Sequence, residues 1–304
     1  MTSIIRSPDG NFANLPEFGF APNYAKIPDS EFGTLRMHYL DEGSRDGPVI
    51  LLMHGQGCWS YIFRRMIPIL VGGGLRVVAP DFIGFGRSDK LPGTEDYTFE
   101  KHVGWLKSFL DLMAFEGISA YFFDWGGYFG LRIAADRPEI FERIALSNTQ
   151  LPVGDAPGRE WFINWRAEQF ALPKFPQGEM VDDGTFSKLT PDTIAAFDAP
   201  YPDESYKTGP RRFPMILPIS PDMASVPENR AAWEKLKAWR KPVLTLFSAG
   251  FRGTAMGPEK ILAHIPGADD QDHALLDEAN FYIVEDRPVE LSSRLLAFVR
   301  GALS

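Results

Sequence analysis

The 304-residue chain holds a single cysteine, Cys58, so it forms no internal disulfide and offers no cysteine cluster for a metal ion. It has no apolar run of about 18 residues, which argues against a transmembrane helix. Its first residues lack the basic start and apolar core of a signal peptide. It also lacks an excess of positive charge: 31 lysine and arginine residues against 40 acidic ones give a formal net charge of −9, which argues against nucleic acid or an anionic membrane as partner. We therefore expect a folded cytoplasmic protein without a metal site.

The sequence does contain short, continuously apolar stretches that alternate with helix-like ones. Residues 48–55, 75–80 and 143–148 have the composition of buried strands, and residues 102–117 have apolar side chains at helical spacing. Because strands buried on both faces are separated by helices, the pattern predicts a mostly parallel sheet with helices on both sides.

The middle of the chain has a different pattern. Between residues 151 and 240 prolines are frequent, helix-like pieces appear and long strand-like runs are absent. The sheet pattern resumes at residues 241–250 and continues through residues 273–286. We therefore expect a core domain made of residues 1–150 and 241–304, with residues 151–240 inserted as a helical cap.

One acidic residue interrupts the apolar stretch "YFFDWGGYFG" (residues 121–130). Asp124 ends a strand and opens a helix, so it is expected at the edge of the sheet where ligands bind. The sequence Asp-Trp-Gly-Gly resembles the nucleophile elbow G-x-S-x-G, with aspartate in the serine position and small neighbours around a strained backbone. The helix start is expected to lower the pKa of Asp124, and an ionised carboxylate there can attack a carbon and form an ester. The alternative is that Asp124 is only a helix cap.

A second motif, "HGQGCWS" (residues 54–60), follows the first strong strand. In α/β-hydrolases a His-Gly pair at this place opens a loop whose backbone N–H contributes to an oxyanion hole. Gln56 holds the corresponding position. His54 itself is expected to be buried and bonded to backbone.

The order of these motifs resembles the haloalkane dehalogenase family of the α/β-hydrolase fold. The stretches that carry the resemblance span nearly the whole chain and include "LRMHYLDEG", "WSYIFRRMIP", "VVAPDFIGFGRSDK", "DWGG", "FINWRAE" and "IPGADDQDH". The resemblance implies an α/β-hydrolase with a mostly parallel sheet, flanking helices and a helical cap. It also implies a small, apolar, halogenated substrate, a halide ion as leaving group, an alkyl-enzyme ester that water hydrolyses, and no cofactor.

Residue by residue, the resemblance makes Asp124 the nucleophile and makes Trp125 and Trp165 the two donors that hold the halide ion. Indole N–H groups suit that role because they donate hydrogen bonds and cannot accept them. For Trp165 the alternative is ordinary packing of a helix in the cap.

The chain departs from the family pattern at the catalytic positions. The family's water-activating histidine lies in a stretch like "AGHFLQED", which here reads "EANFYIVED", and Asn280 is expected at its place. Asparagine can hold a water molecule but cannot take its proton. The orienting acid is missing both near Asn148 and in "SAGFRGTAMG" (residues 248–257), where the family has a loop like "SDSDPITRG". His273 is a weaker candidate for the base, and a structural role suits it better.

Further departures lie close to the expected nucleophile. Gly57 and Cys58 stand where the family usually has proline and threonine, and Phe123 replaces a polar residue. Three hypotheses remain open. The protein is a dehalogenase-like enzyme with impaired ester hydrolysis, an α/β-hydrolase in which Asp124 serves other chemistry, or a non-catalytic protein that binds a small ligand. The sequence leaves open whether the missing histidine arose naturally or by design.

Overall fold

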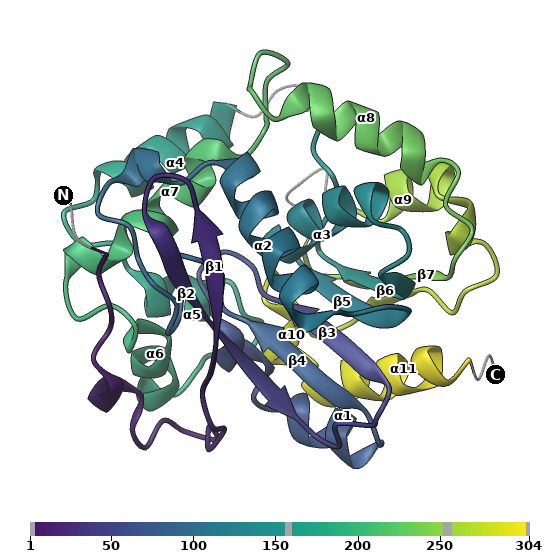
Figure 1. The fold of residues 1–304 in the computed structure, drawn as a ribbon, viewed down its shortest axis with the longest axis horizontal. Helices are drawn as coiled ribbons and strands as arrows, with labels where there is room; N and C mark the ends of the chain where they lie inside the picture. The colour runs from purple at the N-terminus through teal and green to yellow at the C-terminus, as the bar shows by residue number, and fades with distance from the viewer. Residues whose placement is uncertain (1–3, 156–159, 252–256, 302–304) are drawn as a thin grey trace.

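The computed structural model describes residues 4–155, 160–251 and 257–301. In these residues eight strands form one sheet with the order β1-β2-β4-β3-β5-β6-β7-β8 (Figure 1). The first two strands form an antiparallel hairpin at one edge, β2 also pairs antiparallel with β4, and every pair from β4 to β8 is parallel. The strands are β1 (Asn23–Asp29), β2 (Gly33–Glu42), β3 (Val49–Met53), β4 (Arg76–Pro80), β5 (Ile118–Phe123), β6 (Phe141–Ser147), β7 (Val243–Ser248) and β8 (Ala274–Leu276).

Helices follow the strands in alternation, as the sequence predicts. They are α1 (Ile67–Gly72), α2 (Phe99–Met113), α3 (Trp125–Asp136), α4 (Glu160–Ala171), α5 (Gln177–Asp183), α6 (Pro191–Asp198), α7 (Thr208–Ile216), α8 (Val226–Leu236), α9 (Glu259–His264), α10 (Ile283–Asp286) and α11 (Pro288–Arg300). Short 3-10 turns lie at Asp9–Phe12, Ser60–Phe63, Thr94–Asp96, Glu204–Lys207 and Pro266–Ala268.

The sheet is covered on both faces. Apolar side chains of α2 and α3, such as Phe109 and Phe129, form one buried cluster with one face of the sheet. Side chains of α1 and α11, such as Leu70 and Leu295, form a second cluster with the other face. Because β5 lies between these clusters, all six of its residues are buried. The predicted α/β architecture, a mostly parallel sheet flanked by helices, is confirmed.

The segment between β6 and β7 is helical. Helices α4 to α7 gather on the left of Figure 1, whereas α8 lies at the upper right beside α3. The side chains of α8 explain its position: Asn229 accepts a hydrogen bond from Arg132 of α3 at 3.0 Å, and Trp233 donates to the carbonyl of Leu151 at 2.8 Å. We infer that the cap consists of α4 to α7 and that α8 belongs to the core, so the cap is shorter than residues 151–240.

The last strand is also shorter than predicted. β8 ends at Leu276, and the chain then leaves the sheet before entering α10. Beyond Leu276 the backbone no longer pairs in a ladder, because the carbonyl of Asn280 accepts hydrogen bonds from the side chains of Asn148 and Ser248. The predicted strand through residues 277–283 is therefore wrong: residues 277–282 form a loop whose Phe281 contacts Phe123 at the end of β5, and Ile283 begins α10.

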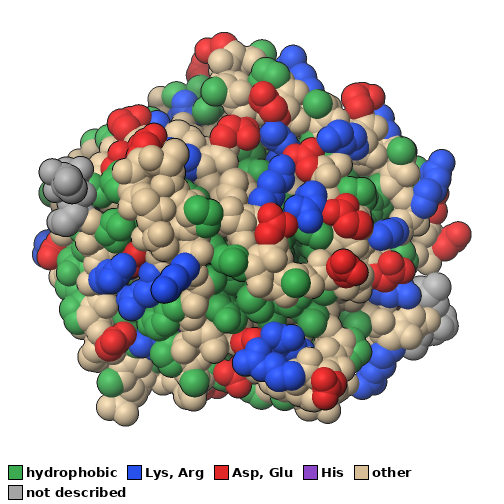
Figure 2. All heavy atoms as spheres, viewed as in Figure 1, with side chains coloured by type: hydrophobic (Ala, Val, Ile, Leu, Met, Phe, Trp, Pro, Cys, Tyr) green, Lys and Arg blue, Asp and Glu red, His purple; other side chains and the backbone are tan. Residues whose placement is uncertain are grey.

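On the face shown in Figure 2, acidic and basic side chains are intermixed rather than gathered in one patch. No helix among residues 4–155, 160–251 and 257–301 is both long and apolar enough to cross a bilayer. The same residues contain no group of three or more histidine, cysteine, aspartate and glutamate side chains placed to hold a metal ion.

Candidate active site

Asp124 sits on a sharp reversal between β5 and α3. Its backbone has φ 49° and ψ −115°, a left-handed conformation that costs free energy for any residue other than glycine. The turn is held from both sides: the amide of Asp124 donates to the carbonyl of Ser147 at 3.2 Å, and the Thr149 hydroxyl donates to the carbonyl of Asp124 at 2.6 Å. The predicted elbow therefore has the expected strained geometry.

The close neighbours of the elbow must be small. A Cβ atom on Gly55 would lie 2.6 Å from the Cβ and Oδ2 atoms of Asp124, and one on Gly126 would lie 2.3 Å from the carbonyl oxygen of Met53. Only glycine fits at these two places. Gly55 of the motif "HG" and Gly126 of the motif "DWGG" thus have a steric reason within this chain.

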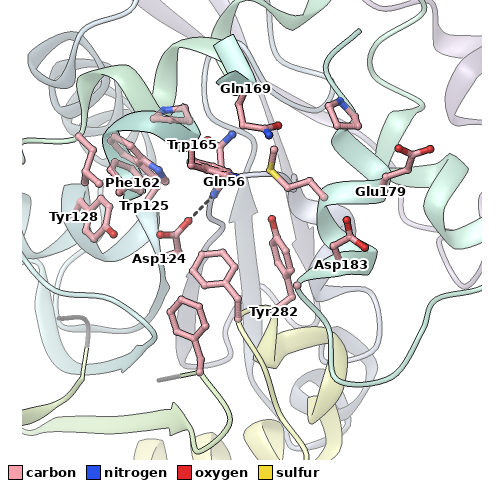
Figure 3. Close-up of a pocket in the computed structure, with 17 residues that line it drawn as sticks. Gln56, Asp124, Trp125, Tyr128, Phe162, Trp165, Gln169, Glu179, Asp183 and Tyr282 are labelled. Carbon is pink, nitrogen blue, oxygen red and sulfur yellow. Dashed lines mark hydrogen bonds between the residues drawn. The ribbon is translucent and has the colours of Figure 1, made fainter. Parts of the chain in front are cut away.

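The Asp124 carboxylate is buried and receives hydrogen bonds. The backbone N–H of Gln56 donates to Oδ2 at 2.7 Å, so the loop after β3 reaches the acid as expected (Figure 3). Burial raises the pKa of Asp124 to about 7, against the lowering effect of hydrogen bonds from the amides of Gln56 and Trp125 and from the Tyr128 hydroxyl. The helix start does lower the pKa of Asp124 through the amide of Trp125, as predicted, but the net pKa is raised because the loss of water outweighs the donors.

A cavity of about 410 Å³ opens above Asp124. Trp125 and Trp165 both line it, together with Gln56, so the structure brings the four predicted side chains Asp124, Trp125, Trp165 and Gln56 to one place. In Figure 3 both indoles and Gln56 lie above the carboxylate, and Tyr282 stands to its right. Trp125 is buried against Phe213 at 4.4 Å between ring centroids, whereas the half-buried Trp165 stacks on Phe162 at 5.6 Å.

Asn280 does not reach this cavity. The backbone N–H of Asn280 donates to the Asp286 carboxylate at 2.9 Å, and its backbone carbonyl accepts hydrogen bonds from the side chains of Asn148 and Ser248. The next two residues, Phe281 and Tyr282, line the cavity. The prediction for Asn280 is thus corrected by one residue. Counted back without a gap from the shared Glu-Asp pair at residues 285–286, "ANFYIVED" places Phe281 opposite the histidine of "AGHFLQED".

A second phenylalanine lies next to the first. Phe251, in the loop after β7, lines the cavity with its ring 5.0 Å from that of Phe281. Phe123, the residue before Asp124, lies 5.7 Å from Phe281 on the other side. Three rings therefore pack together where the resemblance leads one to expect a histidine and its acid.

Asn148 also has a clear role in this region. It lies at the end of β6 with φ 45°, and its side-chain amide donates to the carbonyl of Phe281 at 2.9 Å and to the Ser248 hydroxyl at 2.8 Å. Its Oδ1 accepts from the amide of Ser248 at 3.1 Å. The amide thus ties the ends of β6 and β7 to the loop that carries Phe281.

No histidine lines the cavity in the described part of the chain. His273 has both ring nitrogens in use: Nδ1 bonds to Thr245 and Nε2 to the carbonyl of Ala268 at 2.6 Å. His54 is buried and bonds to the backbone of Gly55 and Phe82, and burial lowers its pKa to about 4. Neither is placed to take a proton from water beside Asp124.

The glycine at position 57 is explained by Tyr282. A Cβ atom on Gly57, whose φ is +77°, would lie 2.2 Å from the hydroxyl oxygen of Tyr282. The phenol of Tyr282 therefore fills the space that a side chain at position 57 would need. Tyr282 thus packs against Gly57 on one side and lies 4.9 Å from the ring of Phe281 on the other.

Sequence reasoning missed Tyr128, Phe251, Phe281 and Tyr282 as site residues. Tyr128 was detectable, because it follows Asp124 by four residues on α3 and so lies on the same helix face. Phe281 was detectable from the ungapped count to residues 285–286. Phe251 and Tyr282 had no local signal, since only tertiary packing brings their loops to the cavity.

The comparisons with known proteins agree with this geometry. Residues 48–204 match the family model described as the alpha/beta hydrolase fold, which places the chain in that class. A haloalkane dehalogenase of Psychrobacter cryohalolentis is 44% identical over 97% of this chain and 98% of its own length, and one of Mycobacterium marinum is 43% identical over 97% and 99%.

The structural neighbours point the same way. Haloalkane dehalogenase DpaA of Paraglaciecola agarilytica NO2, whose structure is tetrameric, superposes with a TM-score of 0.89 at 29% identity over 99% of both chains. The chain therefore belongs to the haloalkane dehalogenase family, whose named members are hydrolases that act on carbon–halide bonds.

Proposed function

We propose that Asp124 carries out the first half of a dehalogenation and that the second half is impaired. A carboxylate oxygen of Asp124 forms a bond to the halide-bearing carbon of a small alkyl halide while the carbon–halogen bond breaks. The halide leaves with the electron pair of that bond, near Trp125 and Trp165. The product is an alkyl ester of Asp124 and a free halide ion.

One observation carries this proposal: the buried carboxylate of Asp124 faces a cavity lined by Phe281 and Phe251, where the family resemblance leads one to expect the base and the acid. Phe281 and Phe251 have no atom that takes a proton from water. General-base assistance typically accelerates such a step by about 10² to 10⁴-fold, so an ester without it persists. Asn280, the predicted site of the missing base, is not among the residues that line the cavity, and an asparagine side chain cannot take a proton from water.

The test is a single time course with 1-bromobutane and 1,2-dibromoethane. Bromide release is measured over time, and the intact protein mass is taken at the end. We expect up to one equivalent of bromide and a stable mass increase at Asp124, both absent from Asp124→Asn. Continuous release would mean that hydrolysis is intact, and absence of both bromide and adduct would exclude the alkylation itself.

A second function is favoured by the pKa of about 7 at Asp124. A carboxyl group that titrates near neutrality suits proton transfer to or from a bound ligand. Under this alternative Asp124 acts as an acid or base, or the cavity simply holds a ligand. The absence of an adduct, together with ligand binding that depends on Asp124, would support it over alkylation.

A further inference from the structure

The charged residues that line the cavity all have the same sign. Among the described residues they are Asp124 at the inner end and Glu179 and Asp183 on α5, and none is lysine, arginine or histidine. Glu179 and Asp183 are four residues apart on one helix face, and Figure 3 shows both across the cavity from Asp124. The cavity is therefore acidic at two separated places.

The two places differ in exposure. Asp124 is buried, whereas Glu179 and Asp183 are exposed and mark the mouth. Asp183 lies 3.4 Å from the Nζ atom of Lys188, but both side chains are mostly exposed, so that pair is weak in water. Glu179 has no ion pair among the described residues, so its charge faces the opening of the cavity.

Between these carboxylates the walls are aromatic. The rings belong to Trp125, Phe162, Trp165, Phe251, Phe281 and Tyr282. The face of an aromatic ring carries negative electrostatic potential and attracts cations, most strongly where water is excluded. Gln56 adds to this character, since its Nε2 donates to the carbonyl of Pro210 at 3.0 Å while its buried Oε1, an acceptor, has no partner in the part of the chain that the structure describes.

We propose that this cavity binds an organic ammonium cation, with the charged group among the aromatic rings and the carboxylates of Glu179 and Asp183 at the mouth. A neutral alkyl chain gains nothing from the two carboxylates at the mouth, and an organic anion that enters past them is repelled. Where the proposed function holds, on which this extension rests, the substrate is a haloalkyl ammonium whose carbon–halogen bond points to Asp124 and whose cationic end points to the mouth.

The first test measures binding without reaction. Choline and 3,3-dimethylbutan-1-ol have nearly the same shape, but a carbon atom replaces the charged nitrogen in the alcohol. Calorimetric titration is expected to show choline binding about tenfold more tightly, the range of a partly desolvated cation–π site. Glu179→Gln with Asp183→Asn is expected to weaken choline binding about three- to fivefold and to leave the alcohol unchanged.

A matched control separates local from general charge effects. Glu168 is exposed on α4, another cap helix, and does not line the cavity. Glu168→Gln removes the same charge as Glu179→Gln and is expected to leave choline affinity unchanged. An equal loss of choline affinity in Glu168→Gln and Glu179→Gln would overturn the proposal. Equal affinities of the protein for choline and the alcohol, or no choline binding, would overturn it as well.

The second test follows the reaction. (2-Bromoethyl)trimethylammonium and 1-bromo-3,3-dimethylbutane form the corresponding pair of bromides, and intact mass reports the alkylation rate. We expect the cation to react about tenfold faster at low ionic strength, with the difference shrinking in high salt. If neither bromide alkylates the protein but choline still binds over the alcohol, the dehalogenation fails and the cation site stands. If the two bromides alkylate the protein at equal rates and choline binds no more tightly than the alcohol, the cation site fails and the dehalogenation stands.

Discussion

The two halves of the candidate site have changed very differently. The half built from the ends of β3 and β5 keeps the elbow, the Gln56 amide on the Asp124 carboxylate and the indole of Trp125. The half built from the loops after β7 and β8 presents Phe251, Phe281 and Tyr282. Under the proposed function, the first half supplies the groups that attack carbon, and the second half presents rings where the family resemblance implies groups that activate water.

The replaced half is well packed and does not resemble simple decay. The ring of Phe281 packs against the rings of Phe123 and Phe251. The side-chain amide of Asn148 donates hydrogen bonds to the backbone carbonyl of Phe281 and to the Ser248 hydroxyl, and so ties this loop to β7. Random loss of a base would leave a hole or an unpaired polar group, which costs stability. Under the proposed function, bond formation and ester hydrolysis depend on physically separate walls of the cavity, so that each wall can be changed by itself.

The largest effect is expected from restoring the second wall. Phe281→His together with Phe251→Asp places a base beside Asp124 and an acid beside the base, since the two rings are now 5.0 Å apart. Steady-state bromide release is expected to rise about 100-fold, in the range of general-base assistance. A polar variant without a basic nitrogen, Phe281→Gln with Phe251→Asp, serves as control. An equal gain in this control would show that polarity, and not proton transfer, limits hydrolysis.

How far the sequence alone reaches differs between the two walls. The elbow at Asp124 and the strands β3 to β7 follow from local patterns of apolar residues and glycines, and these predictions hold. The choice between Asn280 and Phe281 lay within reach of the sequence, because the ungapped count from Glu285 and Asp286 selects Phe281, the residue that lines the cavity. The net rise in the pKa of Asp124 was not predictable, because the sequence reveals the helix start, which lowers the pKa, but not the loss of water around the acid, which raises it.

The next-largest effect concerns stability, and it tests whether the residues at positions 57 and 282, which lie against each other, depend on one another. Gly57→Ala brings a Cβ to 2.2 Å from the Tyr282 hydroxyl at a positive φ, and we expect it to lower the free energy of unfolding by about 2 kcal/mol. Adding Tyr282→Phe to the Gly57→Ala protein is expected to restore roughly half of that loss, because it removes the hydroxyl that the new Cβ would meet. Gly104→Ala is the control, because a Cβ there meets no atom within 4 Å. The free energy of unfolding is measured with denaturant for the wild-type protein, the two single variants, their double variant and the control. Strictly additive losses in the double variant would show that positions 57 and 282 are independent.

The pH dependence of alkylation tests the retained wall. Only the carboxylate form of Asp124 attacks, and burial raises its pKa to about 7. The rate is therefore expected to be low at acidic pH, to rise about tenfold between pH 6 and pH 8 and then to level off. The adduct yield at short times, followed by intact mass with 1-bromobutane, gives the profile. A rate that is flat from pH 5 to pH 9 would mean that Asp124 titrates at its ordinary pKa and that water reaches it.

The smallest effect is expected at Tyr128. Its hydroxyl hydrogen-bonds the Asp124 carboxylate and lowers the pKa of that acid, in opposition to burial. Tyr128→Phe removes the donor while keeping the ring against Trp125, whose centroid lies 5.1 Å away. The midpoint of the pH–rate profile is thus expected to move upward, so that alkylation at pH 7 slows about two- to threefold while the plateau at high pH hardly changes. An unchanged midpoint with a lower plateau would instead show that Tyr128 positions the carboxylate without influencing its ionisation, because a misplaced nucleophile slows the reaction equally at every pH.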